Sequence, residues 1–186
     1  EELLSQMTVE EKLGYIGGID WMYTKSIDRL GIHRMRMSDG PQGIGTKGKS
    51  TAYPATVTLA ATWNENLAYQ YGKALGRDCR ARNINVILGP AVNIYRAPMC
   101  GRNFEYMGED PYLTSRICVG YIKGVQDQGV MATVKHFVAN NSDYDRNNIS
   151  NDIDERTLNE IYFPAYKAAI QEAEVGAIMT SYNLMN

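Results

Sequence analysis

The sequence predicts an α/β fold, a partial TIM-type (β/α)8 barrel with about four strand–helix units and a mostly parallel sheet. Short apolar segments alternate regularly with longer segments in which apolar residues recur at helical spacing. The expected strands, such as residues 86–88, are apolar at successive positions, which is typical of parallel strands covered by helices. Four such units in 186 residues amount to half of a barrel that typically has about 250 residues. A doubly wound sheet is the competing topology, but no G-x-G-x-x-G motif follows an expected strand.

Four helices are expected, and each has a recognisable start signal. The first helix is expected to begin at Thr8, in a Thr-x-x-Glu capping box. Asn64 and Asp110 are the candidate N-cap residues of the second and third helices, and the fourth helix is expected to begin near Asp154. A proline at the first helical position supports the start at Asp110. The fourth helix is expected to end at Gly176, and Pro164 can kink it.

The expected strands are short apolar segments between these helices and after the last one. They cover residues 34–37, 85–88, 131–138 and 177–182. The first strand is expected to lead into a turn at residues 38–41, where Asp39 is followed by glycine and proline.

Composition excludes several classes of function. Nineteen Lys+Arg against 21 Asp+Glu give a net charge of -2, which offers no electrostatic footprint for nucleic acid or an anionic membrane. No apolar run approaches the roughly 20 residues that span a bilayer. The three cysteines, Cys79, Cys100 and Cys118, are odd in number and widely spaced, so we expect buried thiols rather than disulfides or metal ligands. We therefore expect no metal and no cofactor.

The chain ends leave the compartment open. The sequence begins at Glu1 without a basic and apolar leader, so any targeting segment would lie outside it. It stops at Asn186 just after an apolar segment and without a closing helix. We expect a truncated chain.

Polar residues follow or interrupt every expected strand. Asp39 follows the first strand, and the stretch from Asn93 to Arg102 follows the second. Lys135 and His136 interrupt the third strand, and Tyr182 and Asn183 lie at the end of the fourth. Because the carboxyl ends of barrel strands meet at one face, we expect these side chains to share a pocket. Ordinary structural roles are the alternative: Asp39 can shape a turn, and Tyr182 can be a buried core tyrosine.

Three neighbouring features have a structural interpretation. Arg102 and Glu105 can form an ion pair that braces the loop. Asp110, preceded by Glu109, is interpreted as a helix cap rather than part of a catalytic dyad. Cys100 has no activating base in a recognisable motif, so it is assigned a structural role.

Lys135 and His136 give the sharpest local signal. A charged lysine is almost never fully buried without a partner, so either a ligand or a nearby carboxylate is expected to satisfy it. Neighbouring residues of an extended strand face opposite sides of the sheet. If both side chains converge on one site, the backbone must leave regular β geometry there, through a bulge or a cis peptide bond.

The expected side chains suit a small neutral ligand that is dense in hydroxyl groups. Carboxylate, guanidinium, ammonium, imidazole and phenol groups together donate to and accept from hydroxyls. A sugar has this chemistry. Trp21, Trp63 and some of the 13 tyrosines could supply apolar faces for its ring.

The same segments closely resemble glycoside hydrolase family 3, the β-glucosidase and β-xylosidase group. The resemblance spans nearly the whole chain in family order, at residues 7–12 (MTVEEK), 35–43 (MRMSDGPQG), 88–93 (LGPAVN), 101–111 (GRNFEYMGEDP), 134–137 (VKHF), 154–158 (DERTL) and 180–183 (TSYN). It implies that residues 1–186 are the N-terminal part of the family's N-terminal barrel domain, incomplete at the C-terminus. It also implies a retaining β-glucosidase-like parent enzyme that needs no cofactor.

The resemblance implies roles for individual residues. The hydroxyls of the sugar in the -1 subsite would be held by Asp39, Arg102, Lys135 and His136. The site near the reacting centre would be lined by Arg146 and Tyr182. The catalytic Asp nucleophile and Glu acid/base of the family are expected beyond Asn186, so no catalytic residue is assigned within this chain. The chain alone is therefore expected to be inactive, and the expected partner is a small-molecule or oligosaccharide β-glycoside.

Two alternatives stay open at this point. Lys135 could form a Schiff base with a carbonyl substrate in a lyase or aldolase barrel. A non-catalytic barrel could keep the hydroxyl-binding residues and lack the carboxylates. The sequence leaves both glucose and xylose open as the sugar.

Overall fold

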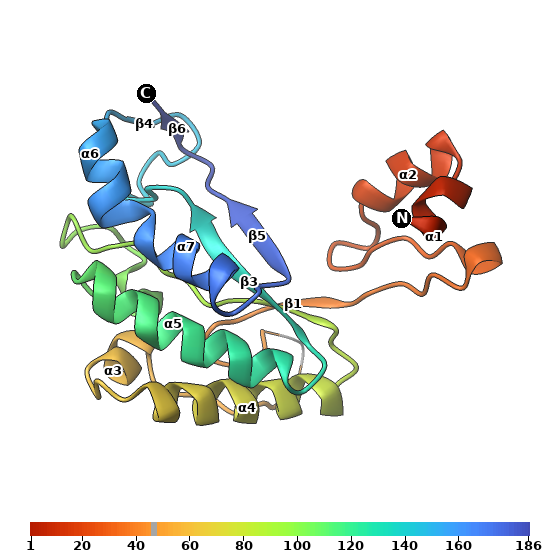
Figure 1. Cartoon of the computed structure of the whole chain (residues 1–186), viewed down its shortest axis with the longest axis horizontal. Helices are drawn as coiled ribbons and strands as arrows, with labels where there is room; N and C mark the ends of the chain where they lie inside the picture. Colours follow the sequence, from red (N-terminus) through yellow and green to blue (C-terminus); the bar gives the residue numbers. More distant parts are fainter. Residues whose placement is uncertain (46–47) are drawn as a thin grey trace.

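The computed structural model describes residues 1–45 and 48–186 and contains a four-stranded parallel sheet (Figure 1). Its strands lie in sequence order: β1 (Met37–Asp39), β2 (Val86–Leu88), β3 (Met131–Phe137) and β5 (Ala177–Thr180). The sheet is open, with β1 and β5 at its two edges. The predicted partial barrel is confirmed.

Three helices pack side by side along this sheet, α4 (Glu65–Ala81), α5 (Pro111–Gln126) and α7 (Pro164–Gln171) (Figure 1). The predicted caps are confirmed, because Asn64 and Asp110 accept hydrogen bonds from the backbone N–H groups of Leu67 and Leu113. A short helix, α3 (Thr56–Ala60), lies beside α4 and α5.

Glycines allow α4 and α5 to approach each other closely. A Cβ added to Gly124 of α5 would lie 2.1 Å from the Tyr69 carbonyl oxygen, and one added to Gly72 of α4 would lie 2.2 Å from the Tyr121 carbonyl oxygen. Both clashes involve backbone atoms, which cannot swing aside. The helix pair therefore depends on these two positions.

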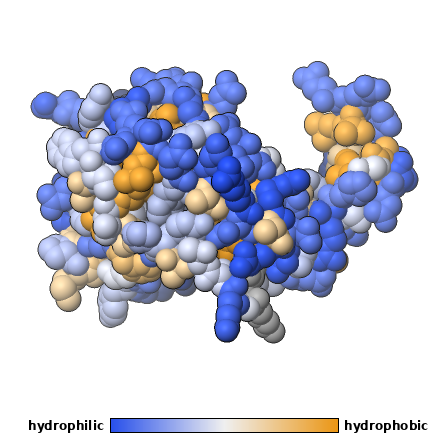
Figure 2. Space-filling view, turned by 90° about the horizontal axis from the view of Figure 1, so that it is seen from below, coloured by the Kyte–Doolittle hydropathy of each residue, from blue (hydrophilic) through white to orange (hydrophobic). Residues whose placement is uncertain are grey.

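The N-terminal segment stands apart from the sheet and its helices (Figure 1). It contains α1 (Glu2–Gln6), α2 (Val9–Ile16) and the 3-10 turn η1 (Asp28–Leu30). The capping box of Thr8 and Glu11 is present, and α1 and α2 bury no residue. Figure 2 shows apolar side chains gathered on this segment, and its exposed large apolar residues include Leu4, Leu13 and Ile16.

Several boundaries differ from the expectation. The first strand is Met37–Asp39 rather than 34–37, because β1 pairs with β2 only from Met37 onward, so Asp39 ends the strand instead of shaping a turn after it. The strands predicted at 85–88, 131–138 and 177–182 are each shorter at one end.

The fourth predicted helix is divided into three pieces. These are α6 (Glu155–Thr157), a π-helical turn η3 (Leu158–Tyr162) and α7, which ends at Gln171 rather than Gly176. Pro164 begins α7 because a proline lacks the N–H that would continue the preceding helix. The 3-10 turn η2 (Asn103–Glu105) and the short pair β4 (Ser150–Asn151) and β6 (Leu184–Met185) carry no signal in the sequence analysis.

The core lies between the sheet and its helices. It includes Leu75, Ile87, Ile117 and Val134, all fully buried. The three cysteines are free and buried, as predicted. Among the helices of the described residues, none has the length and apolar character that a membrane crossing requires.

Candidate functional site

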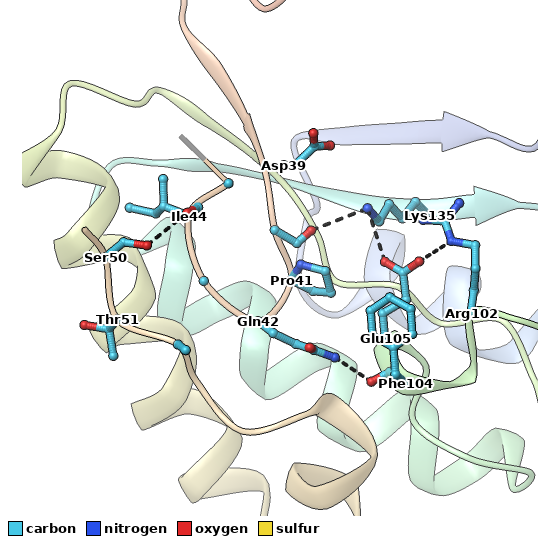
Figure 3. A pocket seen from close by; sticks show the side chains of 14 residues that line it. Asp39, Pro41, Gln42, Ile44, Ser50, Thr51, Arg102, Phe104, Glu105 and Lys135 are labelled. Atoms are coloured by element: carbon cyan, nitrogen blue, oxygen red, sulfur yellow. Dashed lines mark hydrogen bonds and ion pairs between the residues drawn. The ribbon is translucent and has the colours of Figure 1, made fainter. Parts of the chain in front are cut away.

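A cavity of about 440 Å³ opens beside the carboxyl end of β1 (Figure 3). Its charged lining comes from β1, from the loop after β2 and from β3, and consists of Asp39, Arg102, Glu105 and Lys135. Uncharged residues from 40–45, 50–52 and 104 complete the wall. Three of the residues predicted from the sequence therefore meet in one cavity.

Lys135 is buried at the wall of this cavity, with only 4% of its surface exposed. Its Nζ lies 3.5 Å from Glu105 Oε2 and donates to the Gly40 carbonyl oxygen at 3.4 Å. Burial lowers the pKa of the Lys135 ammonium, and the Glu105 carboxylate opposes this shift. The expected carboxylate partner of the buried lysine is thus Glu105.

Glu105 joins two cations. Its Oε1 accepts from Arg102 Nε while its Oε2 faces Lys135, so one buried carboxylate links the two groups (Figure 3). The predicted Arg102–Glu105 ion pair is confirmed, and the turn η2 places the two side chains on the same side. Asp39 is exposed and near enough to raise the pKa of Lys135.

His136 lies next to the cavity rather than in its lining. Its ring packs edge-on against Tyr106, with 6.3 Å between ring centroids, and 5% of its surface is exposed. Burial and the positive charges of Arg102, Lys135 and Arg146 lower the pKa of His136 to about 2. Its imidazole is therefore neutral at physiological pH, and within the described part of the chain its Nδ1 has no hydrogen-bond partner.

The backbone at this point departs from regular β geometry, as predicted for convergence of the two side chains. The peptide bond between Lys135 and His136 is cis, and the register of β3 against β5 shifts between Lys135 and Phe137. Lys135 enters the cavity wall, and the His136 ring stands beside Arg102 and Tyr106.

Arg146 and Tyr182 form a separate pair outside the cavity lining. Arg146 Nη1 donates to Asp143 Oδ1 at 2.7 Å, and its guanidinium lies 5.1 Å from the centroid of the Tyr182 ring. Tyr182 is 67% exposed, so the alternative of a core tyrosine is wrong. Arg146 is one of the cations whose charge lowers the pKa of His136.

A second hollow, of about 580 Å³, shares Asp39 and Gly45 with the first cavity. Its wall includes Trp21, which is 92% exposed, together with Tyr23 and Arg36. Asp39 thus stands between two hollows. The sequence predicts that Trp21 could supply an apolar face for a sugar ring, but its position in the same hollow as Asp39 has no local sequence signal.

Two contacts of the site have no local signal in the sequence. The role of Glu105 as partner of Lys135 depends on contact between a loop and a strand that are far apart in the chain. Asn93 belongs to the polar stretch predicted after the second strand, but the binding of its side chain to the backbone of His136 depends on contact with a distant part of the chain. Among the described residues, no group of three or more His, Cys, Asp or Glu side chains could hold a metal ion.

Comparison with known proteins identifies the family. The family model described as the glycosyl hydrolase family 3 N terminal domain matches residues 11–186. The chain belongs to this family. Because Asp39, Arg102 and Lys135 all fall within the matched residues, the cavity that they share lies in the family's N-terminal domain.

The relatives of this family 3 chain are longer proteins. Thermostable beta-glucosidase B of Acetivibrio thermocellus is 43% identical and is matched over 100% of this chain and 26% of its own length. Beta-glucosidase BoGH3A of Bacteroides ovatus is 47% identical, over 98% of this chain and 26% of its own. The solved structure of the beta-glucosidase from Kluyveromyces marxianus in complex with glucose superposes with a TM-score of 0.97 at 40% identity, over 100% of this chain and 23% of its own. The chain thus spans about a quarter of the length of these relatives.

Proposed function

We propose that the protein containing this chain is a retaining β-glucosidase and that residues 1–186 supply the part of its barrel that holds the terminal sugar. The proposal is supported by the family membership, by relatives named as β-glucosidases and by a solved relative in complex with glucose. The structural observation that carries it is the charged wall of the cavity, in which Arg102, Glu105 and Lys135 are linked beside Asp39.

These groups match the hydrogen-bonding needs of a pyranoside. The Lys135 ammonium and the Arg102 guanidinium are pure donors, and the Asp39 carboxylate is a pure acceptor. A sugar hydroxyl donates and accepts at once, so it can bridge Asp39 and Lys135. Glu105 orients both cations, which reduces the side-chain entropy lost when the sugar binds.

The proposal gives His136 a different role from that of Arg146 and Tyr182. The neutral imidazole of His136 can donate from one nitrogen and accept at the other, which suits a hydroxyl at the inner end of the site. Arg146 and Tyr182, which contact each other outside the cavity lining, are proposed to line the site near the reacting centre of a bound glycoside.

We assign the chemical step to carboxylates outside this chain. A retaining glycosidase uses two carboxyl groups about 5–5.5 Å apart, one as nucleophile and one as acid/base. Glu105 is occupied by Arg102 and Lys135, which makes it a poor nucleophile for an anomeric carbon. A Schiff base at Lys135 is not favoured, because the relatives of the chain are named as β-glucosidases.

The second hollow is proposed to receive the group that follows the terminal sugar. The exposed Trp21 ring offers an apolar face next to Asp39, and the flat face of a second sugar or an aryl aglycone can pack on it.

The test compares the full-length protein with the 186-residue chain on p-nitrophenyl β-D-glucopyranoside. We expect turnover by the full-length protein, release of β-glucose as the first anomer seen by NMR, and no turnover by the chain alone. The matched β-D-xyloside measures the preference between the two sugars. Turnover by the chain alone, or release of the α-anomer, would contradict the assignment.

A further inference from the structure

The side chain of Asn93 binds both backbone polar groups of a single residue on the neighbouring strand. Its Oδ1 accepts from the His136 N–H at 2.8 Å, and its Nδ2 donates to the His136 carbonyl oxygen at 3.0 Å. Asn93 is only 2% exposed, so both bonds are shielded from water. The Tyr166 hydroxyl donates to the same carbonyl oxygen at 2.7 Å.

This contact continues the sheet where the backbone no longer does. The Lys135 N–H donates to the Pro90 carbonyl oxygen at 3.0 Å, and the Val92 N–H donates to the Lys135 carbonyl oxygen at 2.8 Å. In a regular parallel sheet the polar groups of the next residue, His136, would point to the other neighbour, β5. β3 shifts register against β5 at this point, and the carboxamide of Asn93 takes the place of a peptide group of a neighbouring strand.

We propose that Asn93 is a positioning residue for the sugar site. It lies outside the described lining of the cavity, so it acts through His136 and Lys135. By holding the His136 backbone from two sides, it fixes the imidazole against Tyr106 and the Lys135 ammonium against Glu105. This inference rests on the proposed function for its catalytic consequence and on the two hydrogen bonds for its structural part.

The first experiment is Asn93→Ala in the full-length protein. We expect kcat/KM for p-nitrophenyl β-D-glucopyranoside to fall about 100-fold, the loss that a displacement of about 1 Å can cause at a reacting site. The variant Asn93→Asp keeps the acceptor for the His136 N–H and loses the donor, so its loss should be intermediate. Val125→Ala, in the fully buried part of α5, is the stability-matched control and should lower Tm without changing kcat/KM.

A second readout does not depend on hydrolysis. The backbone amide of His136 should exchange with solvent faster in Asn93→Ala, while that of Val134 keeps its protection. If the wild-type protein is inactive but this exchange accelerates, the proposed function is wrong, whereas the structural part of the inference, that Asn93 holds the backbone of His136, is upheld. If kcat/KM and the exchange at His136 are both unchanged in Asn93→Ala, the inference is overturned. It is also overturned if Val125→Ala loses as much activity at the same Tm.

Discussion

Replacing Glu105 by glutamine should destabilise the protein more than any other single loss of charge in the cavity. Glu105→Gln keeps the shape of the side chain and removes the negative charge that faces Lys135 and Arg102. The Lys135 side chain is 6% exposed, so solvent cannot replace that charge. The variant therefore leaves an uncompensated buried ammonium.

The magnitude follows from the geometry. At 3.5 Å and an effective dielectric constant of about 20, the attraction between Glu105 and Lys135 is about 5 kcal/mol. Removing one partner of a buried pair typically costs about 3–5 kcal/mol. The Arg102 side chain is 18% exposed, and water compensates part of its loss. We expect a decrease of about 3–5 kcal/mol in the free energy of unfolding, a large share of the 5–15 kcal/mol typical of a domain.

Urea denaturation followed by circular dichroism measures this change, with an unaltered m-value as the check on two-state behaviour. The matched control is Glu109→Gln, which alters an exposed carboxylate in the same loop and should change stability by less than about 0.5 kcal/mol. Lys135→Met in the Glu105→Gln background should recover part of the loss, with a coupling energy of about 0.5–3 kcal/mol. A loss below about 1 kcal/mol for Glu105→Gln would refute a charged, water-excluded cluster.

Three further predictions concern the pH response, the second hollow and the helix pair. The pKa of His136 is lowered to about 2 in the folded state, so below a pH of about 6.5 only the unfolded chain takes up a proton at this residue. The free energy of unfolding should therefore fall by about 1.4 kcal/mol per pH unit on acidification. If the free energy of unfolding of a His136→Gln variant changed with the same slope between pH 7 and 5, this prediction would be contradicted. Trp21→Ala should raise KM for cellobiose about 2- to 10-fold with little change in kcat. The control Trp63→Ala, which alters a separate hollow, should leave KM unchanged. Equal KM values in Trp21→Ala and wild type would show that Trp21 is not part of the site. Gly124→Ala should lower the free energy of unfolding by about 1–3 kcal/mol or more, because its Cβ would lie 2.1 Å from a carbonyl oxygen of α4. The control Gly14→Ala should be neutral, because its Cβ would meet only the end of a flexible lysine side chain. Equal thermal melts for the two variants would argue against the close helix contact.

Much of the fold could be predicted because its signals are local. The apolar runs at β2 and β3 and the caps Asn64 and Asp110 depend on residues within a few positions of one another. The start of β1 could not be predicted, because Met37 is the first residue that pairs with β2. The π-helical turn before Pro164 also has no distinct sequence pattern.

In the candidate site, too, some features could be predicted from the sequence and others could not. Asp39, Arg102 and Lys135 could be expected together because the carboxyl ends of parallel strands meet, and the structure places them in one cavity. The link between Glu105 and Lys135 could not be predicted, because it depends on the path of the loop after β2.

The chain order of the sheet has a consequence for synthesis. Since β1, β2, β3 and β5 lie next to one another in the order in which they leave the ribosome, each strand can add to an edge that its predecessor has just formed. The sheet can thus grow in one direction without waiting for a later segment to be inserted between existing strands. At every stage the two edges of the sheet are β1 and the newest strand, so a pause in translation changes only which strand forms the second edge that a neighbouring chain could pair with.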